Sequence, residues 1–493
     1  MTIQFPFDNL YARMPAGFFA RVEPTPTQSP RLVQLNRALA IELGLDPDAL
    51  DTPEGAEILA GKRIPEVAEP LAMAYAGHQF GHFVPQLGDG RAILLGEVVD
   101  RAGERRDIQL KGSGPTPYSR NGDGRAALGP VLREYLVSEA MHALGIPTTR
   151  ALAAATTGEQ VYRETALPGA VLTRVASSHI RVGTFQFFAA RGRVDALRQL
   201  ADHAIARHYP DAAQAASPYR ALLEGVAARQ GRLVAQWLLV GFIHGVMNTD
   251  NMSVAGETID YGPCAFMDAY DPRTVFSSID QFGRYAYANQ PGIAQWNLAR
   301  LAECLLPLLD PNEEAAVAQA QEALGAFADA FNEGYLGGLR RKLGLLREQP
   351  DDIDLAQALF SAMAAARADF TLTFRRLADA ALGPQHEAGL RGLFGSEQAA
   401  LDEWLAVWRD RLAAEDAPAE TRRAAMLRAS PAVIPRNHRV EAALSAAIER
   451  DDYAPFEEMA RVLADPYAES ADASPLAQPP AEDRSDYRTF CGT

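Results

Sequence analysis

Hydrophobic positions divide the chain into stretches with different patterns. Residues 1 to about 70 are broken by prolines, and Pro30–Leu43 carries leucines at helical spacing, which predicts a short helix there. From Phe83 to about Leu110, short apolar runs alternate with turns, which predicts a small antiparallel sheet with a glycine-containing hairpin. A helix is expected next, over about Pro130–Leu144, because apolar residues recur on one face and Gly145 follows them.

Beyond residue 195 the pattern is mostly helical. Amphipathic helices are predicted over Asn312–Leu345, Asp354–Leu382 and Glu397–Glu415, and Pro272–Asn289 is predicted to be a loop. The longest apolar segment, Leu233–Met247, is too short and too polar to span a membrane and is better interpreted as a core helix.

Net charge narrows the classes of partner. The 47 basic and 63 acidic side chains give a net charge of −16, which would repel a polyanion over most of the surface. Nucleic acid is therefore not an expected partner. The first residues show neither the basic region nor the apolar core of a secretory signal, so we expect a cytoplasmic protein without a membrane partner. We also expect the protein to be a monomer.

Cysteines are few. Cys264, Cys304 and Cys491 do not make a disulfide framework and lack the C-x-x-C spacing of a zinc site. Cys491 stands two residues from the last residue, after a polar tail rich in Pro and Ala that starts at about Asp465. A thiol on such a tail could reach distant partners, or could be an unreactive exposed cysteine.

The segment His244–Met252, followed by Ile259–Gly262, carries the most specific pattern of polar residues. Asp250 and Asp260 are ten residues apart, and Asn251 follows the first of them. Phosphoryl-transfer enzymes of the kinase type use one Asp to orient the acceptor hydroxyl, and an Asn and a second Asp to hold metal against phosphates. The alternative is a capped turn in which these side chains bond to their own backbone. An apolar run before the loop and a short β-like run at residues 252–254 after it predict a helix, a loop and a hairpin.

Lys111 at the end of a predicted strand is a candidate phosphate ligand. Glu134, 23 residues later on the predicted helix, is the natural partner for its ammonium group, and Glu139 is the second choice. Without the two downstream carboxylates, a solvated lysine at a strand end would be the better interpretation.

A Gly-Asp-Gly turn precedes this strand. Gly88 and Gly90 would let backbone N–H groups approach phosphate without a Cβ in the way, although an ordinary hairpin turn has the same sequence. Arg91, Arg174 and Arg181 carry planar donors suited to phosphate, although any single arginine is more often a surface residue.

With these residues assembled, the chain resembles the selenoprotein O family of pseudokinase-like protein adenylyltransferases. This resemblance implies an α+β, protein-kinase-like two-lobed fold, with a small antiparallel sheet lobe, a large helical lobe, and N- and C-terminal extensions. It also implies that ATP lies flipped, so that AMP is transferred to Ser, Thr or Tyr hydroxyls of protein substrates. The strings that carry the resemblance are Tyr75–Gly81, Leu87–Arg91, Gln109–Arg120, Asp123–Arg125, His244–Asn251 and Asp260–Pro263.

Carried over position by position, the resemblance makes Asp250 the proton acceptor, and Asn251 with Asp260 the ligands of Mg2+ (or Mn2+). Ala255 stands where a conventional kinase has its metal-binding Asn, so Asn251 must take that role. Near-terminal cysteines of the family are thought to act in redox control, which makes a Cys264–Cys491 disulfide a hypothesis. The residues implied to bind ATP are Gly88, Gly90, Arg91, Lys111, Asp123, Gly124, Arg174, Arg181 and Asp260.

Pattern and resemblance together divide the chain into four parts. Residues 1–70 are an N-terminal extension, 71–195 a nucleotide-binding region, 196–464 a helical lobe with the catalytic loop, and 465–493 a flexible tail. Two other functions stay open: a conventional protein or small-molecule kinase, and a non-catalytic nucleotide-sensing scaffold. Transfer of label from α-labelled or γ-labelled ATP would distinguish the three.

Overall fold

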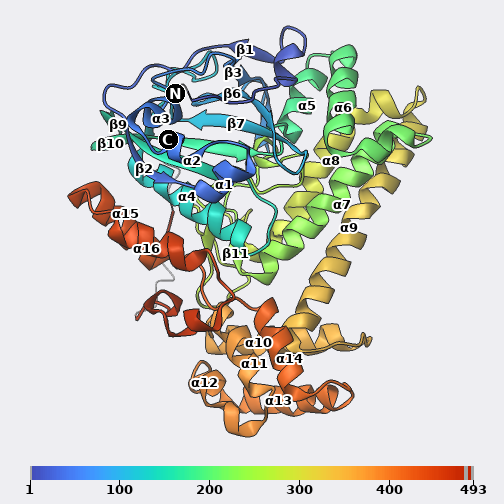
Figure 1. Ribbon diagram of the computed structural model, residues 1–493. Helices are drawn as coiled ribbons and strands as arrows, with labels where there is room; N and C mark the ends of the chain where they lie inside the picture. Colours follow the sequence, from blue (N-terminus) through green and yellow to red (C-terminus); the bar gives the residue numbers. More distant parts are fainter. Residues whose placement is uncertain (1–2, 482–486, 490–493) are drawn as a thin grey trace.

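The computed structural model describes residues 3–481 and 487–489, and it is a mixed α/β structure (Figure 1). One antiparallel sheet dominates the N-terminal part, with strand order β1-β3-β6-β7-β10-β9-β2 and with β8 paired to β10. Its strands are β1 (Phe19–Arg21), β2 (Arg31–Leu35), β3 (Leu71–Met73), β6 (Ala92–Val99), β7 (Arg105–Lys111), β8 (Ala126–Ala127), β9 (Arg150–Tyr162) and β10 (Ala166–Ala176).

The sheet register brings the predicted cationic residues together. Lys111 lies opposite Leu172, and Gln109 lies opposite Arg174, in the β7–β10 pair. Residues two apart on a strand share a face, so Gln109, Lys111 and Arg174 all point to the same side of the sheet. Helix α4 (Leu128–Ala143) packs against β9 and β10 and carries Glu134 to this side, close to the predicted helix over Pro130–Leu144.

Two local predictions for the N-terminal part were wrong. Within Pro30–Leu43 only α1 (Arg37–Glu42) is helical, because Arg31–Leu35 is strand β2 and pairs with β9. The Gly88–Gly90 turn does not close a hairpin, because the strand before it pairs elsewhere: β5 (His82–Val84) pairs with β4 (Gly77–Gln79) in a separate sheet. Strands β6 and β7 do pair as an antiparallel hairpin in the main sheet, as the apolar pattern predicted. Helices α2 (Pro47–Leu50) and α3 (Pro53–Leu59) complete this region.

Helices form the rest of the molecule (Figure 1). Helices α7, α8 and α9 pack on one another beside the sheet, and the long α9 leads to a second helical group, α10 to α14, at the bottom of the view. Hydrophobic cores follow the same division, one at α5 to α9 and another at α10 to α14. The bounds are α5 (Val182–Ala189), α6 (Val194–His208), α7 (Pro218–Leu239), α8 (Gln290–Leu309), α9 (Glu313–Leu343), α10 (Asp352–Ala366), α11 (Phe370–Ala380), α12 (Ala388–Arg391), α13 (Gln398–Ala413) and α14 (Ala419–Ala429).

The helices over Asn312–Leu345 and Glu397–Glu415 agree with α9 and α13, and residues 272–289 are a loop apart from a short 3-10 turn at their end. Three other details differ from the prediction. The helix expected over Asp354–Leu382 is split at Arg367, whose φ of 51° ends α10. The apolar run at Leu233–Met247 leaves the helix at Leu239 and continues as β11 (Phe242–Ile243), which pairs with β12 (Ala265–Phe266). The strand expected at residues 252–254 is reduced to one isolated bridge between Ser253 and Arg181.

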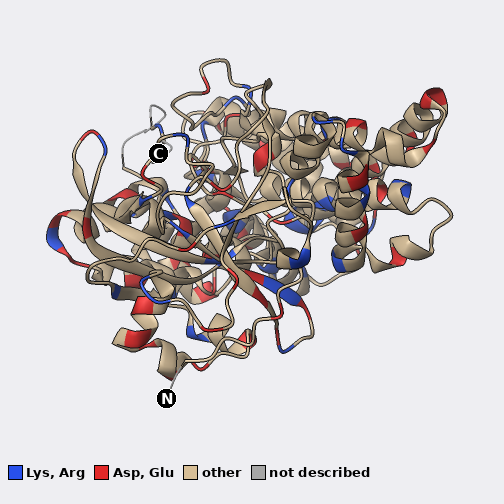
Figure 2. Ribbon diagram, turned by 90° about the horizontal axis from the view of Figure 1, so that it is seen from above, with Lys and Arg blue, Asp and Glu red and all other residues tan. Residues whose placement is uncertain are grey.

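The chain then returns to the sheet. Helices α15 (Asn437–Arg450) and α16 (Ala454–Leu463) pack on α4, so residues far apart in the sequence share one core. The tail predicted from about Asp465 is anchored over its described part, where Asp472 pairs with the buried Arg375 at 2.7 Å. Within the described part of the chain, no helix combines the length and apolar character that crossing a bilayer requires. Acidic and basic residues are interspersed along the ribbon in the view of Figure 2.

Candidate active site

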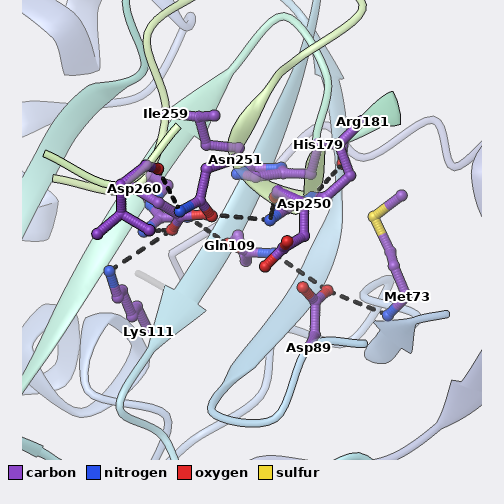
Figure 3. A network of polar contacts seen from close by, with 12 residues as sticks. Met73, Asp89, Gln109, Lys111, His179, Arg181, Asp250, Asn251, Ile259 and Asp260 are labelled. Carbon is purple, nitrogen blue, oxygen red and sulfur yellow. Dashed lines mark hydrogen bonds and ion pairs between the residues drawn. The ribbon is translucent and has the colours of Figure 1, made fainter. Parts of the chain in front are cut away.

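Four charged side chains from four segments, Lys111, Glu134, Arg174 and Asp260, meet at the sheet. Figure 3 shows Lys111 and Asp260 of this group, with Arg181 and Asp250 nearby. Lys111 Nζ lies 2.5 Å from Glu134 Oε2, and Arg174 Nη2 lies 2.6 Å from Glu134 Oε1. Arg174 Nη2 also donates to Asp260 Oδ1 at 2.8 Å, and Lys111 Nζ lies 3.6 Å from the same oxygen. Glu139, the second choice as partner of Lys111, pairs instead with Arg150 at 2.8 Å.

Asp260 is the centre of this cluster. Arg181, the N-cap residue of α5, donates to Asp260 Oδ2 at 2.9 Å and to the backbone oxygen of Asp250 at 2.8 Å. Burial disfavours the charge of Asp260, but Arg174, Arg181 and Lys111 together hold its pKa well below its usual range. Asp260 has a φ of 61°, a left-handed conformation that Asp tolerates better than most residues, and a tight turn follows it.

Asp250 shares Arg181 Nη1 with Asp260, through its backbone oxygen. Asp250 is only 7% exposed, and burial raises the pKa of its carboxyl to about 6. Gln79 Nε2 donates to Asp250 Oδ2 at 3.2 Å, whereas Oδ1 is buried without a hydrogen-bond partner among the described residues. A general base must be able to take up a proton near the working pH, and a carboxyl with a pKa raised toward neutral pH has that property.

Contacts within this segment tie the loop that carries Asp250 to the residues around Asp260. His244 Nε2 lies 2.9 Å from the backbone oxygen of Ile259, which joins the start of the loop to the residue before Asp260. The β11–β12 pair closes the segment on the other side. Asn251 donates its amide to the backbone oxygen of Val246 at 2.9 Å, so the side-chain oxygen of Asn251 is the atom left for a ligand.

Tyr118 packs closely against the Gly88–Gly90 turn. A Cβ at Gly88 would lie 2.4 Å from the ring of Tyr118, and one at Gly90 would lie 3.0 Å from the Tyr118 backbone oxygen. Close packing alone therefore requires a glycine at position 88, whose φ is 78°. Between the two glycines, Asp89 accepts from the backbone of Met73 at 3.0 Å and from Gln109 at 3.3 Å (Figure 3). Gln109 in turn accepts from Arg174 at 3.4 Å and links the turn to the cluster.

Asp123 and Gly124 lie on the loop that leads to β8. Asp123 pairs with Arg163 at 2.9 Å, and no contact between Asp123 and the Lys111 cluster occurs among the described residues. A Cβ at Gly124 would lie 2.1 Å from the backbone of Gly114, so this glycine is required by the approach of two loops.

A cavity of about 420 Å³ opens beside Lys111. Its lining combines apolar side chains with a charged set, which comprises Arg91, Lys111, Arg133, Glu134, Glu441 and Arg488. A cavity with both kinds of lining can accept a ligand that has an apolar part and a charged part. Its apolar and C-terminal lining includes Ala126, Val131, Leu172, Leu444, Ile448, Tyr487 and Thr489.

A divalent cation would find oxygen donors here. Asn251 offers an amide oxygen and Asp260 a carboxylate, and Mg2+ typically takes one or two such protein ligands together with phosphates and water. No three His, Cys, Asp or Glu side chains of the described residues are grouped as an all-protein metal site would need. The donor set therefore fits a cation that arrives with a phosphate.

Two site residues had no role in the sequence reasoning. Tyr75 lies under the Arg181 guanidinium, 4.4 Å from the ring centre, and Gln79 holds Asp250. Both stand in the string Tyr75–Gly81, which carried the resemblance without an assigned chemistry. Cys264 is buried, and its proposed partner Cys491 lies outside the described residues.

Comparison with known proteins gives a consistent result. The model of the family described as "Protein adenylyltransferase SelO" matches residues 2–464. A "Protein nucleotidyltransferase YdiU" from Bradyrhizobium sp. (strain ORS 278) is 68% identical over 493 residues, which is 100% of both chains. A protein of the same description from Rhodopseudomonas palustris (strain BisB18) is 67% identical, again over 100% of both chains.

Proposed function

The chain belongs to the protein adenylyltransferase SelO family and is a nucleotidyltransferase, and we propose that it moves AMP from ATP to hydroxyl groups of proteins through the site at Asp250 and Asp260. The observation that carries the assignment of the site is the grouping of three cations, the half-buried Lys111 and the buried Arg174 and Arg181, around Asp260. With Glu134 and Asp260 counted, the group has a charge of 3 − 2 = +1 before Arg91 is added.

This excess of positive charge suits the polyphosphate of ATP. In the proposed complex the terminal phosphates face Lys111, Arg174 and Arg181, and the α-phosphate faces Asp250. The pairing of a strand lysine with a helix glutamate, beneath a sheet and against a helical part, supports a kinase-like two-lobed arrangement. In it, residues 71–195 would be the nucleotide-binding region and residues 196–464 the helical lobe.

Asp250 would act as the proton acceptor. The acceptor hydroxyl loses its proton to Asp250 while its oxygen forms a bond to the α-phosphorus. The bond from that phosphorus to the bridging oxygen of the β-phosphate breaks, and pyrophosphate leaves. A carboxyl with a pKa near 6 is deprotonated at neutral pH and still basic enough to take the proton.

Asn251 and Asp260 would hold the divalent cation, Mg2+ (or Mn2+), in the loaded enzyme. When bound, this cation would neutralise part of the negative charge on the phosphates. Arg174 and Arg181 keep the Asp260 carboxylate oriented and ionised for this role.

Isotopic labelling tests the proposal. The purified chain is incubated with an acceptor peptide that contains Ser, Thr and Tyr, and with either α-labelled or γ-labelled ATP. Protein-bound label from the α position alone supports adenylyl transfer. Label from the γ position alone would show a conventional kinase, and binding of ATP without transfer of either label would show a nucleotide-sensing scaffold.

A further inference from the structure

The β4–β5 hairpin is clasped to the loop that carries Asp250. The backbone N–H of His78 donates to Thr249 Oγ1 at 2.7 Å, and that of Phe80 donates to Asn248 Oδ1 at 3.0 Å. Neighbouring residues of one segment thus bind neighbouring residues of another that lies about 170 positions away in the sequence. The strand β4 is held by the loop itself rather than by the main sheet.

Helix α5 fixes both segments. Gln186 accepts from Thr249 Oγ1 at 2.6 Å, and its amide nitrogen lies 2.8 Å from His78 Nδ1. On the other side of the loop, Tyr285 donates its hydroxyl to Asn248 Oδ1 at 2.6 Å. Buried networks in which each member is satisfied are rigid, so the hairpin and the loop form one frame.

Gln79 and Gly77 are the hairpin residues that meet the Asp250 carboxylate. Gln79 Nε2 donates to Oδ2 at 3.2 Å, while Oδ1 has no partner among the described residues. A Cβ at Gly77 would lie 2.4 Å from Oδ1, so only glycine leaves room for this oxygen. The strand therefore holds one carboxylate oxygen and makes space for the other.

We propose that Gln79 is a positioning residue: it holds Asp250 through Oδ2 while Gly77 packs against the buried Oδ1, so that the hairpin fixes the orientation of the carboxylate that receives the acceptor proton. The inference rests on the proposed function of Asp250 as proton acceptor and adds Gln79 as the residue that positions it. A hydrogen bond to a charged group fixes the carboxylate plane, and a misplaced base transfers protons slowly even when every substrate still binds.

Kinetics of transfer from α-labelled ATP to the acceptor peptide test the inference with the full-length chain. Gln79→Leu removes the amide and keeps most of the side-chain volume, and we expect kcat to fall about 10- to 100-fold, which is what a hydrogen bond to a charge is typically worth. The KM for ATP should change less than about twofold, because Gln79 touches Asp250 and not the cationic cluster. Exposed His82 of the same hairpin supplies the matched control, and His82→Ala should leave kcat unchanged.

A double-mutant cycle separates positioning from a general structural effect. If Gln79 acts through Asp250, Gln79→Leu should have no further effect on kcat in an Asp250→Ala background. Gly77→Ala, which moves the carboxylate by contact with Oδ1, should lower kcat in the wild-type background and be equally silent in that variant. The melting temperature of each variant shows whether the chain is folded.

Each outcome decides one claim. An unchanged or increased kcat for Gln79→Leu overturns the positioning role, and so does a loss of the same size with and without Asp250. If Asp250→Ala itself keeps wild-type transfer, the proposed function of Asp250 fails first. Reduced transfer by Asp250→Ala with an unaffected Gln79→Leu enzyme would leave the proposed function standing and remove only the inference.

Discussion

Glu134 is the counter-charge on which the cationic cluster depends. Its carboxylate accepts from Lys111 Nζ at 2.5 Å and from Arg174 Nε and Nη2 at 2.9 and 2.6 Å, and its side chain is 4% exposed. Glu134→Ala would leave Lys111, Arg174 and Arg181 with Asp260 as their remaining carboxylate partner in the cluster, so the group would carry 3 − 1 = +2.

Removing one partner of a buried charge pair typically destabilises a protein by about 3–5 kcal/mol, because the other charge stays desolvated. We expect a loss of that size in the free energy of unfolding of Glu134→Ala without ligand, measured by urea denaturation. Pyrophosphate or ATP would bring negative charge to the same cations. Either ligand should therefore raise the urea midpoint of the variant by more than that of the wild type, provided the cations keep their places.

Glu139→Ala is the matched control on the same helix. Glu139 pairs with Arg150 and not with Lys111, so this variant should lose stability without a larger response to pyrophosphate. A loss below about 1 kcal/mol for Glu134→Ala would refute the reasoning, because it would mean that Lys111 and Arg174 are solvated in the folded chain.

Three further predictions concern the site and the fold. Asp250→Ala should lower kcat about 10²- to 10⁴-fold, the usual range for a general base, with ATP affinity from calorimetry nearly unchanged; wild-type turnover would exclude the role. Asp260→Ala should abolish the Mg2+ dependence of ATP binding, and surviving dependence in a metal titration would exclude Asp260 as a ligand. Burial lowers the pKa of His203 to about 4 and of His208 to about 3 in the folded chain, whereas a histidine in the unfolded chain has a pKa near 6.5. Between the folded and unfolded pKa values, the unfolded chain therefore binds more protons than the folded chain. The free energy of unfolding should then fall as pH drops below about 6.5, by roughly 2 kcal/mol per histidine at pH 5. Urea denaturation at several pH values should show a smaller fall for His208→Gln than for the wild type. An identical pH profile for that variant would contradict the pKa assigned to His208.

Local pattern was sufficient where one segment decides its own structure. The alternation of short apolar runs predicted the β6–β7 hairpin, and one apolar face predicted α4 with Glu134 on it. It failed where a distant segment competes. Pro30–Leu43 has leucines at helical spacing, yet Arg31–Leu35 pairs with β9, because the edge of a buried sheet offers hydrogen bonds that an isolated short helix does not.

The glycines illustrate the same difference. The sequence marked Gly88 as a position where phosphate could approach the backbone without a Cβ in the way, and the structure adds that the ring of Tyr118 lies where that Cβ would be. Gly77 and Gln79 were part of a recognisable string with no assigned role, because their contacts are to Asp250.

The residues by themselves determined the family, the two carboxylates ten positions apart and the two candidate partners of Lys111, since these depend on residue type and spacing along one stretch. The structure chose Glu134 over Glu139. Only the tertiary structure decided which oxygen of Asp250 is held, how Arg181 joins Asp250 to Asp260, and that α15 and α16 return to cover α4. Those features come from hydrogen bonds and packing between segments far apart in the chain, and spacing along the sequence carries no information about which distant groups will meet.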